Sequence, residues 1–375
     1  MNRISLDITN PKEQLLSVAT SGSKLGYRPE LDGLRGISIL VVYIHHLYRP
    51  LMPAGYLGVD IFFVLSGYLI TSLLVDEWNR KGSIRLKDFY IRRALRLMPA
   101  VFLLILIIGA LSVFVDKWTA TEIHRGIWLT LAYVSNWFYA LGYYTRDNPL
   151  SIAWSLAIEE QFYLSWPLLL ALALRLKLQR WILYVLALII AIIPIYRGIL
   201  VEQGAGALRL YYGSDTHADG LLIGCLVGLL VSWNLLPQNK KLEICMKFLS
   251  VMGIIFFGYL LINYSSLGGR FLFQYGGYTL VLFSIALCLT TVVLYSPKFA
   301  LLVLGFKPLV WIGRISYGLY LWHWTVYWFI YAKRALSNPL DQLVAMVILS
   351  LLLPTLSYYF VEKPFLRWKK RFGSV

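Results

Sequence analysis

Arg35 and His46 are the residues of this 375-residue chain whose types and spacing point most directly to chemistry. Both lie in LDGLRGISILVVYIHHLY, a mostly apolar stretch that we expect to enter a membrane. Eleven residues of α-helix return to within about 20° of the same face and rise about 16 Å. A guanidinium near the membrane surface and an imidazole near mid-depth therefore share one face, whereas His45 points about 100° away. Ionisable groups at such depth usually mark a pathway or a reaction centre.

A second basic pair, Arg93 and Arg96, lies three residues apart in IRRALRLMP. It ends the basic segment 77–96, which we expect to be a cytosolic connection containing an interfacial amphipathic helix. Guanidinium groups bind phosphates through two parallel hydrogen bonds, so the pair is a candidate phosphate clamp. The alternative is ordinary positive charge on the cytosolic side of a membrane protein.

The segment SIAWSLAIEEQFYLSWP places carboxylates inside the membrane. Ser155, Glu159 and Tyr163 share a helix face at four-residue spacing, and we expect this face to be a cavity wall. Trp154 and Gln161 are assigned to the same substrate or cavity region. Glu159 is a catalytic candidate, with a buried hydrogen-bonded anchor as an equally good explanation.

Three further residues are assigned to the substrate or cavity region. GYLGVDIFFVLSGYLI places Asp60 near the outer boundary of the membrane and Ser66 near its middle. Asp60 could instead cap or pair at the surface, and Ser66 could serve only close helix packing. His323, in SYGLYLWHWTVY, is expected at depth, where it would line the cavity.

The composition predicts an all-α, polytopic transmembrane bundle. Hydrophobic residues make up 59% of the chain, charged residues 14%, and the mean hydropathy is +0.66, whereas a soluble domain carries roughly a quarter charged residues. The three cysteines have no paired spacing, so neither a disulfide framework nor a metal site is expected. The net charge is +16, and the basic residues lie between apolar spans. This placement favours membrane topology over nucleic-acid binding as the explanation of the charge.

Hydropathy predicts about ten membrane spans and one ambiguous segment, 126–143. If that segment crossed the membrane, the basic clusters at 175–180, 240–247 and 363–371 would lie outside, so we expect it to be re-entrant or external. Residues 1–26 are expected to be a polar cytosolic tail without a cleaved signal peptide, and residues 27–371 a single membrane domain with both termini cytosolic. The predicted spans are 36–52, 56–75, 97–115, 152–174, 180–196, 215–233, 246–263, 275–295, 311–332 and 340–361.

Ordered motifs along residues 27–368 resemble those of the acyltransferase-3 family of integral membrane O-acyltransferases. They read LDGLRGISILVVYIHH, GYLGVDIFFVLSGYLI, FYIRRALRLMPA, WSLAIEEQFYLSWP, DGLLIGCL, SYGLYLWHW and VEKPF. The Arg-x10-His signature of the family falls on Arg35 and His46, and its Arg-x-x-Arg pattern falls on Arg93 and Arg96. Its Trp-Ser-Leu…Glu motif falls on Trp154, Ser155 and Glu159. His45 is a departure, because it leaves open an exchange of roles with His46.

The resemblance implies transfer of an acyl group, most often acetyl, from cytosolic acyl-CoA to a hydroxyl of an extracytoplasmic glycan or similar acceptor in the cell membrane. Arg35, Arg93 and Arg96 would hold the CoA phosphates, and His46 would remove the hydroxyl proton at the level of the thioester. Glu159 would orient His46, hold the acceptor or relay a proton, and a covalent acyl-histidine or acyl-tyrosine is a variant.

We expect the stand-alone form without an extracytoplasmic SGNH domain, so any acyl relay to such a domain would need a separate protein. The alternative function is a transporter or flippase of a lipid-linked sugar, since intramembrane His, Glu and Arg also line substrate pathways. A cytosolic phosphate clamp favours the enzyme, because a transporter has no need of one.

Overall fold

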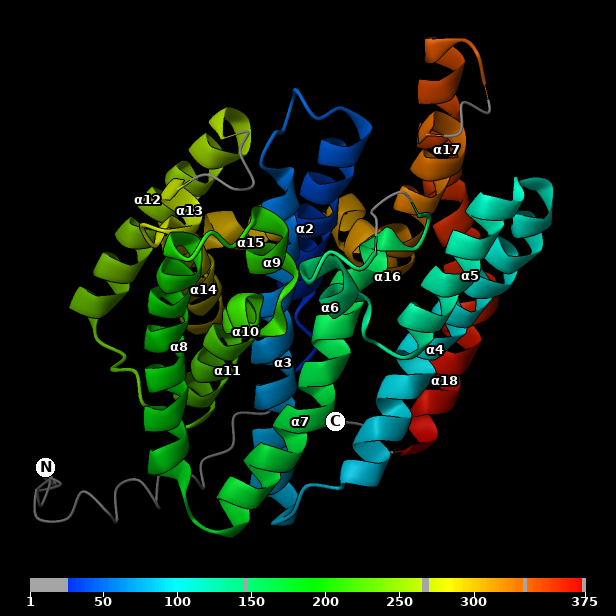
Figure 1. Ribbon diagram of the computed structural model, residues 1–375. Helices are drawn as coiled ribbons and strands as arrows, with labels where there is room; N and C mark the ends of the chain where they lie inside the picture. The colour runs from blue at the N-terminus through cyan, green and yellow to red at the C-terminus, as the bar shows by residue number, and fades with distance from the viewer. Residues whose placement is uncertain (1–25, 145–147, 265–269, 333–335, 373–375) are drawn as a thin grey trace, which may run out of the picture.

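The computed structural model describes residues 26–144, 148–264, 270–332 and 336–372 (Figure 1). These residues form helices joined by short connections, with no strand among them, as the all-α prediction requires. Residues 1–25 of the predicted polar tail lie outside the described part of the chain.

The helices differ widely in length. The long ones are α2 (Pro29–Leu47), α3 (Gly58–Lys81), α4 (Leu86–Leu111), α7 (Trp154–Arg175), α8 (Gln179–Glu202), α12 (Lys240–Asn263), α14 (Gly277–Tyr295), α16 (Lys307–Tyr327) and α17 (Pro339–Leu356). The shorter ones are α5 (Lys117–Leu131), α6 (Ser135–Ala140), α9 (Ala207–Tyr212), α10 (Ser214–His217), α11 (Asp219–Ser232), α13 (Arg270–Phe273), α15 (Lys298–Leu304) and α18 (Lys363–Lys369). A π-helical stretch, Ser357–Glu362, joins α17 to α18.

Six described helices are long and apolar enough to cross a membrane, or seven if the bent pair Lys298–Leu304 and Lys307–Tyr331 is one span. The predicted count of about ten is therefore not confirmed. The helices that were predicted to cross the membrane but are not among these candidates are α2, α7 and α11. Helix α11 has 14 residues, and α2 and α7 carry the ionisable side chains from which the chemistry was predicted.

Helix α4 corrects the expectation for segment 77–96. Helix α3 continues to Lys81 and α4 begins at Leu86, so only a short turn connects them, and no separate interfacial helix forms. The chain after Leu86 continues in helical conformation into the apolar region, and Pro99 lies within α4 without ending it. Arg93 and Arg96 consequently lie on a long helix of the bundle rather than in a loop.

The ambiguous segment 126–143 does not form one continuous helix. It includes the end of α5, a break with Tyr133 in the left-handed region, and α6. Helix α5 packs on α4, and α6 packs on α7 and α9.

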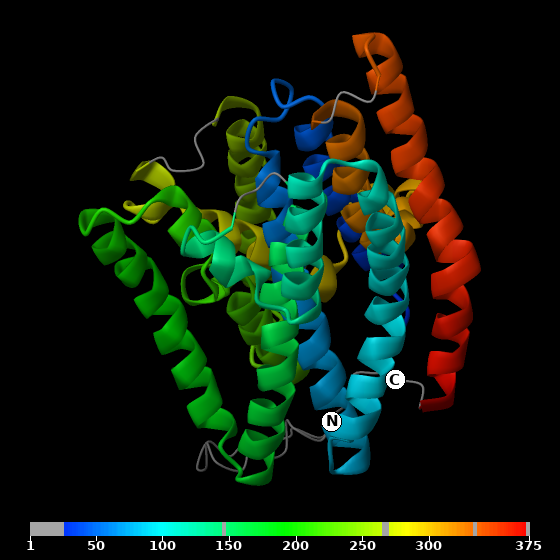
Figure 2. The same cartoon turned by 45° about the vertical axis from the view of Figure 1, so that its right-hand side comes forward.

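Helix α3 is the most buried of the six span candidates. Helices α8 and α17–α18 stand at opposite edges of the bundle (Figure 2), and they expose many apolar side chains. Such faces suit contact with lipid tails. Helices α3 and α11 approach each other closely because Gly224 has no side chain. A Cβ atom at this position would overlap the carbonyl oxygen of Val64.

Helices α2 and α16 make a second close pairing. A Cβ atom at Gly313 of α16 would overlap the carbonyl oxygen of Asp32 in α2, and one at Gly36 would overlap that of Leu309. Small residues let helix backbones meet in this way. The pairing determines how the side chains of α2, including Arg35 and His46, face those of α16.

We predict that Gly313→Ala lowers stability, because the added methyl group must push α2 away from α16. Overpacking of this kind costs about 1–3 kcal/mol. Gly258→Ala in α12 is the matched control, since its Cβ would meet no heavy atom within 4 Å. Thermal unfolding of the purified protein in detergent measures both variants. Equal unfolding temperatures for Gly313→Ala and the unmodified protein would contradict the close pairing.

Candidate functional site

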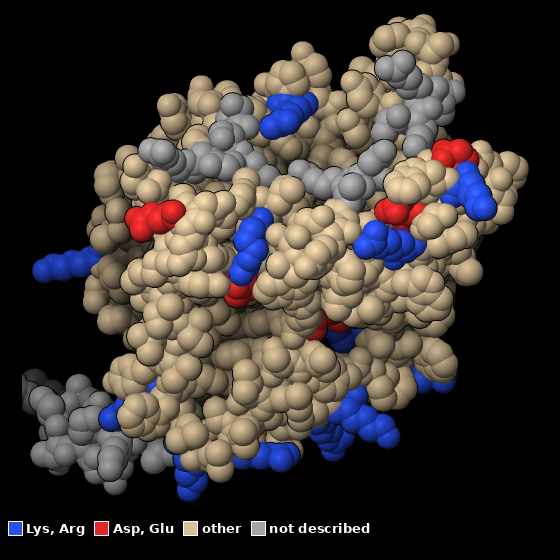
Figure 3. Space-filling model, in the orientation of Figure 1, with Lys and Arg blue, Asp and Glu red and all other residues tan. Residues whose placement is uncertain are grey.

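A cavity of about 690 Å³ lies among α2, α3, α4, α7, α16 and α18. Its lining carries more cationic than anionic side chains, which favours an anionic ligand. Lys and Arg side chains also gather along the lower edge of the molecule in Figure 3, where α4 begins and α7 ends. The cationic lining residues are Arg35, Arg92, Arg93, Arg96 and Lys369, and the acidic ones are Glu77 and Glu159.

The arginines of the cavity are held in different ways. Arg92 forms an ion pair with Glu77 at 3.5 Å, whereas the Arg93 guanidinium lies over the Tyr163 ring, 3.5 Å from its centroid. A ring face attracts a cation without neutralising its charge. Arg35 donates from Nε to Ser316 Oγ at 3.4 Å. Arg93 and Arg35 are therefore positioned by contacts with uncharged groups.

Polar groups from three helices meet in the cavity wall. Ser66 of α3 donates a hydrogen bond to Glu159 Oε1 of α7 at 2.7 Å. The Tyr320 hydroxyl of α16 donates to the carbonyl oxygen of Ile152 at 3.2 Å and lies 2.6 Å from Ser155 Oγ. The structure thus places Ser66, Ser155 and Glu159 in the lining, with Tyr320 as a wall residue that the sequence did not single out.

His46 and His323 do not belong to the cavity lining. His46 Nδ1 lies 3.1 Å from His323 Nε2, and the His323 ring packs on the Tyr320 ring with centroids 5.7 Å apart. Tyr320 therefore lies between the cavity and the histidine pair, because its aromatic side chain fills the space that we expected to be continuous. His45 points elsewhere, with Nδ1 2.8 Å from the Met52 carbonyl oxygen.

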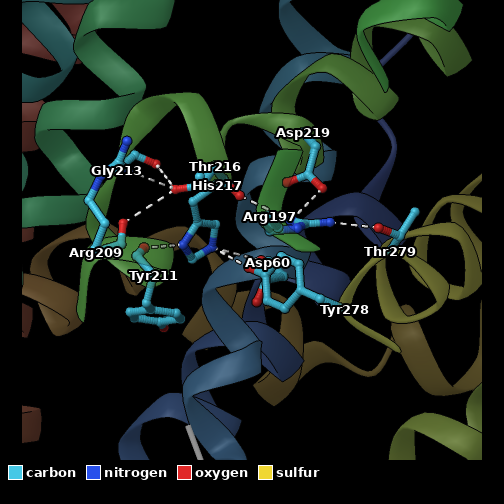
Figure 4. Close-up of polar contacts among 10 residues, drawn as sticks. All are labelled: Asp60, Arg197, Arg209, Tyr211, Gly213, Thr216, His217, Asp219, Tyr278 and Thr279. Carbon is cyan, nitrogen blue, oxygen red and sulfur yellow. Dashed lines mark hydrogen bonds and ion pairs between the residues drawn. The ribbon is translucent and has the colours of Figure 1, made fainter. Parts of the chain in front are cut away.

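Asp60 belongs to a buried network outside the cavity lining (Figure 4). Its Oδ1 accepts a hydrogen bond from the Tyr278 hydroxyl and lies 3.1 Å from His217 Nε2. His217 Nδ1 also contacts the Tyr211 carbonyl oxygen. With Asp60 fully buried, these contacts offset the cost of removing a carboxylate from water.

The same network contains a buried ion pair between Arg197 and Asp219, at 2.8 Å. Arg197 also donates to the Thr216 carbonyl oxygen at 3.0 Å, so it connects α8 to α10 and α11. Arg209, outside the candidate spans, hydrogen bonds to Asp215 at 2.8 Å, and this bond raises the pKa of Arg209. Asp215 and Asp219 belong to the motif DTHADG, whose clustered polar residues were the available sequence signal.

Trp154 and Gln161 also lie outside the cavity lining. The Trp154 ring packs on Tyr211 with centroids 4.8 Å apart. Gln161 donates to Asn136 Oδ1 at 3.0 Å and accepts from Ser214 at 2.6 Å, so it joins α7 to α6 and α10. In the structure Trp154 makes packing contacts and Gln161 makes hydrogen bonds between helices.

The fold and the cavity define a helical membrane protein with a cationic cavity inside its bundle. Residues 28–359 match the acyltransferase domain family, and the chain belongs to this family. It is 33% identical over 351 residues to peptidoglycan O-acetyltransferase OatA of Listeria monocytogenes, covering 90% of this chain and 56% of that protein. It is 35% identical over 349 residues to O-acetyltransferase OatA of Staphylococcus aureus, covering 90% of this chain and 57% of that protein.

The chain therefore spans little more than half the length of these relatives. No solved structure matches the chain.

We predict that a cysteine replacing Ser66 reacts with a negatively charged, water-soluble thiol reagent, because Ser66 lines the cavity and the cationic lining attracts the reagent. Ser72→Cys is the matched control, since Ser72 lies on the same helix and is 1% exposed. The native cysteines Cys225, Cys245 and Cys288 would first be replaced. Mass spectrometry of the purified protein measures labelling. Equal labelling at positions 66 and 72 would contradict an accessible cavity.

Proposed function

We propose that the chain transfers an acyl group from acyl-CoA to a hydroxyl of a cell-wall glycan on the other side of the membrane. The acyl group we propose is acetyl. The observation that carries this proposal is the group of arginines lining one cavity beside Glu159 and Ser155. The names of these relatives specify O-acetyl transfer and in one case peptidoglycan, which supports the acceptor class.

The donor would bind with its phosphates toward the cationic side chains and its thioester toward the end formed by Ser155 and Tyr320. Arg93 and Arg96 suit the phosphates, because guanidinium groups form charge-assisted pairs with phosphate oxygens. Apolar lining residues of α3, including Leu69 and Leu73, suit the pantetheine arm between these ends. This arrangement requires the basic end of the cavity to face the cytosol, where acyl-CoA is made.

The reaction would begin with attack of the acceptor oxygen on the thioester carbonyl carbon, while neutral His46 removes the hydroxyl proton. The carbon–sulfur bond then breaks, the CoA thiolate leaves into the cationic cavity, and the proton passes from His46 to sulfur or water. Because Tyr320 separates the cavity from the histidine pair, direct transfer requires its side chain to rotate. A covalent acyl-enzyme would instead carry the group past this layer.

The proposed orientation places both termini in the cytosol and about ten helical segments across the plasma membrane. Helices α2, α7 and α11 would then cross within the bundle, where their polar side chains contact protein and a cavity rather than lipid. A separate extracytoplasmic protein that relays the acyl group to the glycan is compatible with this orientation.

We predict that Arg96→Ala weakens acetyl-CoA binding by about tenfold or more, since a hydrogen bond to a charged group is worth about 1.5–3 kcal/mol. Arg96→Lys should recover only part of the affinity, because an ammonium cannot reproduce the planar fork of guanidinium. Isothermal titration of the purified protein measures both. Arg175→Ala, at the end of α7 and outside the cavity lining, is the control. Unchanged affinity in an Arg93→Ala, Arg96→Ala double variant would exclude the clamp.

We predict that His46→Ala abolishes detectable acetyl transfer, because general-base assistance contributes about 10²–10⁴-fold. His46→Asn should be equally inactive, since an amide supplies no base. His45→Ala should cost much less, because its side chain contacts the Met52 carbonyl instead of His323. Transfer of radiolabelled acetyl groups in membranes with matched expression measures all three. An inactive His45→Ala variant beside an active His46→Ala variant would exchange the two roles.

A further inference from the structure

His46 and His323 form a directed chain of hydrogen bonds that ends on the backbone. His323 Nδ1 lies 2.9 Å from the carbonyl oxygen of Leu319, one helical turn earlier in α16. His323 Nε2 lies 3.1 Å from His46 Nδ1. These hydrogen bonds join α2 to α16, although His46 and His323 are 277 positions apart in the sequence.

The backbone end of this chain determines where each proton lies. A carbonyl oxygen can only accept, so His323 Nδ1 carries a hydrogen and donates it to Leu319. Within the part of the chain that the structure describes, His323 contacts carbonyl oxygens and imidazole or aromatic rings. Burying a charge among such groups is costly, so the His323 ring is neutral. A neutral imidazole with hydrogen on Nδ1 has an acceptor at Nε2. His46 Nδ1 is therefore the donor.

We infer that His323 is a positioning residue for His46, an inference that rests on the proposed function. By accepting from Nδ1, His323 selects the tautomer of His46 whose Nε2 carries the lone pair. It also fixes the orientation of the ring, which packs at its edge against Trp324 with centroids 5.0 Å apart. A catalytic histidine needs both a defined tautomer and a defined direction, and a partner at the second nitrogen supplies them.

The hydrogen bond from His46 to His323 also changes in strength during the reaction. When Nε2 of His46 takes a proton from the acceptor hydroxyl, the hydrogen on Nδ1 becomes a stronger donor to His323 Nε2. The Leu319 carbonyl keeps the other hydrogen of His323 in place. The proton gained therefore stays on His46 until it passes to sulfur or water, and His323 is neither acylated nor protonated.

The decisive comparison is between His323→Gln and His323→Leu. The Gln side chain can present an oxygen near the position of Nε2, whereas Leu fills similar space without an acceptor. We expect His323→Leu to lower kcat on the order of 10²-fold, with KM for acetyl-CoA changed by less than about twofold, because the donor cavity does not include His323. His323→Gln should recover kcat to within about tenfold of the unmodified protein.

His124→Leu is the control, since His124 contacts Ser112 on a different part of the bundle and should leave kcat unchanged. Thermal unfolding in detergent identifies any variant that is not folded. If His323→Leu retains kcat within twofold, or if folded His323→Gln is as inactive as folded His323→Leu, His323 does not position His46.

A second measurement tests the hydrogen bonds between His46, His323 and Leu319 without requiring enzymatic turnover. Nitrogen-15 magnetic resonance of the unmodified protein, labelled at its five histidines, distinguishes protonated from unprotonated ring nitrogens, and His46→Ala assigns the His46 signals. We expect hydrogen on Nδ1 of His46. Hydrogen on Nε2 in the neutral ring would overturn the inference even if the enzyme is active. Absence of acetyl-CoA turnover in the unmodified protein would instead refute the proposed function, and the tautomer would still be measured.

Discussion

The close approach of α2 and α16 determines the geometry at both ends of the site. Gly36 and Gly313 lack the Cβ atoms that would separate the two backbones. With the helices in contact, Arg35 reaches Ser316 at the level of the cavity, and His46 reaches His323 further along the same axis. A change in the crossing of these helices would move both pairs together. The positions of Arg35 and of the His46 ring consequently depend on one packing contact.

Two groups of ionisable side chains inside the bundle differ in which groups contact and compensate their charge. Asp219 pairs with Arg197, and Asp60 contacts His217 and Tyr278, so each acid has a polar partner within the protein. Removing one member of such a pair leaves an uncompensated buried charge, which is strongly destabilising. These partnered acids stabilise the packing of α3, α8, α11 and α14.

Arg93 and Arg35 of the cavity differ from these acids because uncharged groups hold them, whereas Arg92 pairs with Glu77. The Tyr163 ring supports Arg93, and Ser316 accepts from Arg35. Concentrated positive charge in a low-dielectric setting interacts strongly with an anion that enters. Tyr320 contacts both this cationic cavity and the His323 ring.

The sequence alone determined the class of protein and the contents of individual helix faces. Hydropathy indicated the membrane bundle, and helical periodicity indicated that Ser155 and Glu159 share a face, because these properties depend only on residues near one another in the chain. Periodicity also separated His46 from His45, whose ring nitrogens contact different partners in the structure.

Tertiary structure decided which faces meet. Asp60 and Gln161 were assigned to the substrate or cavity region, yet their partners from α6, α10 and α14 place them in hydrogen-bond networks outside the cavity lining. The partner of His323 lies 277 residues away, and Tyr320 separates it from the cavity. Such contacts depend on where helices cross and how closely glycines let them approach. Local sequence patterns specify the side of a helix, but they do not specify what packs against it.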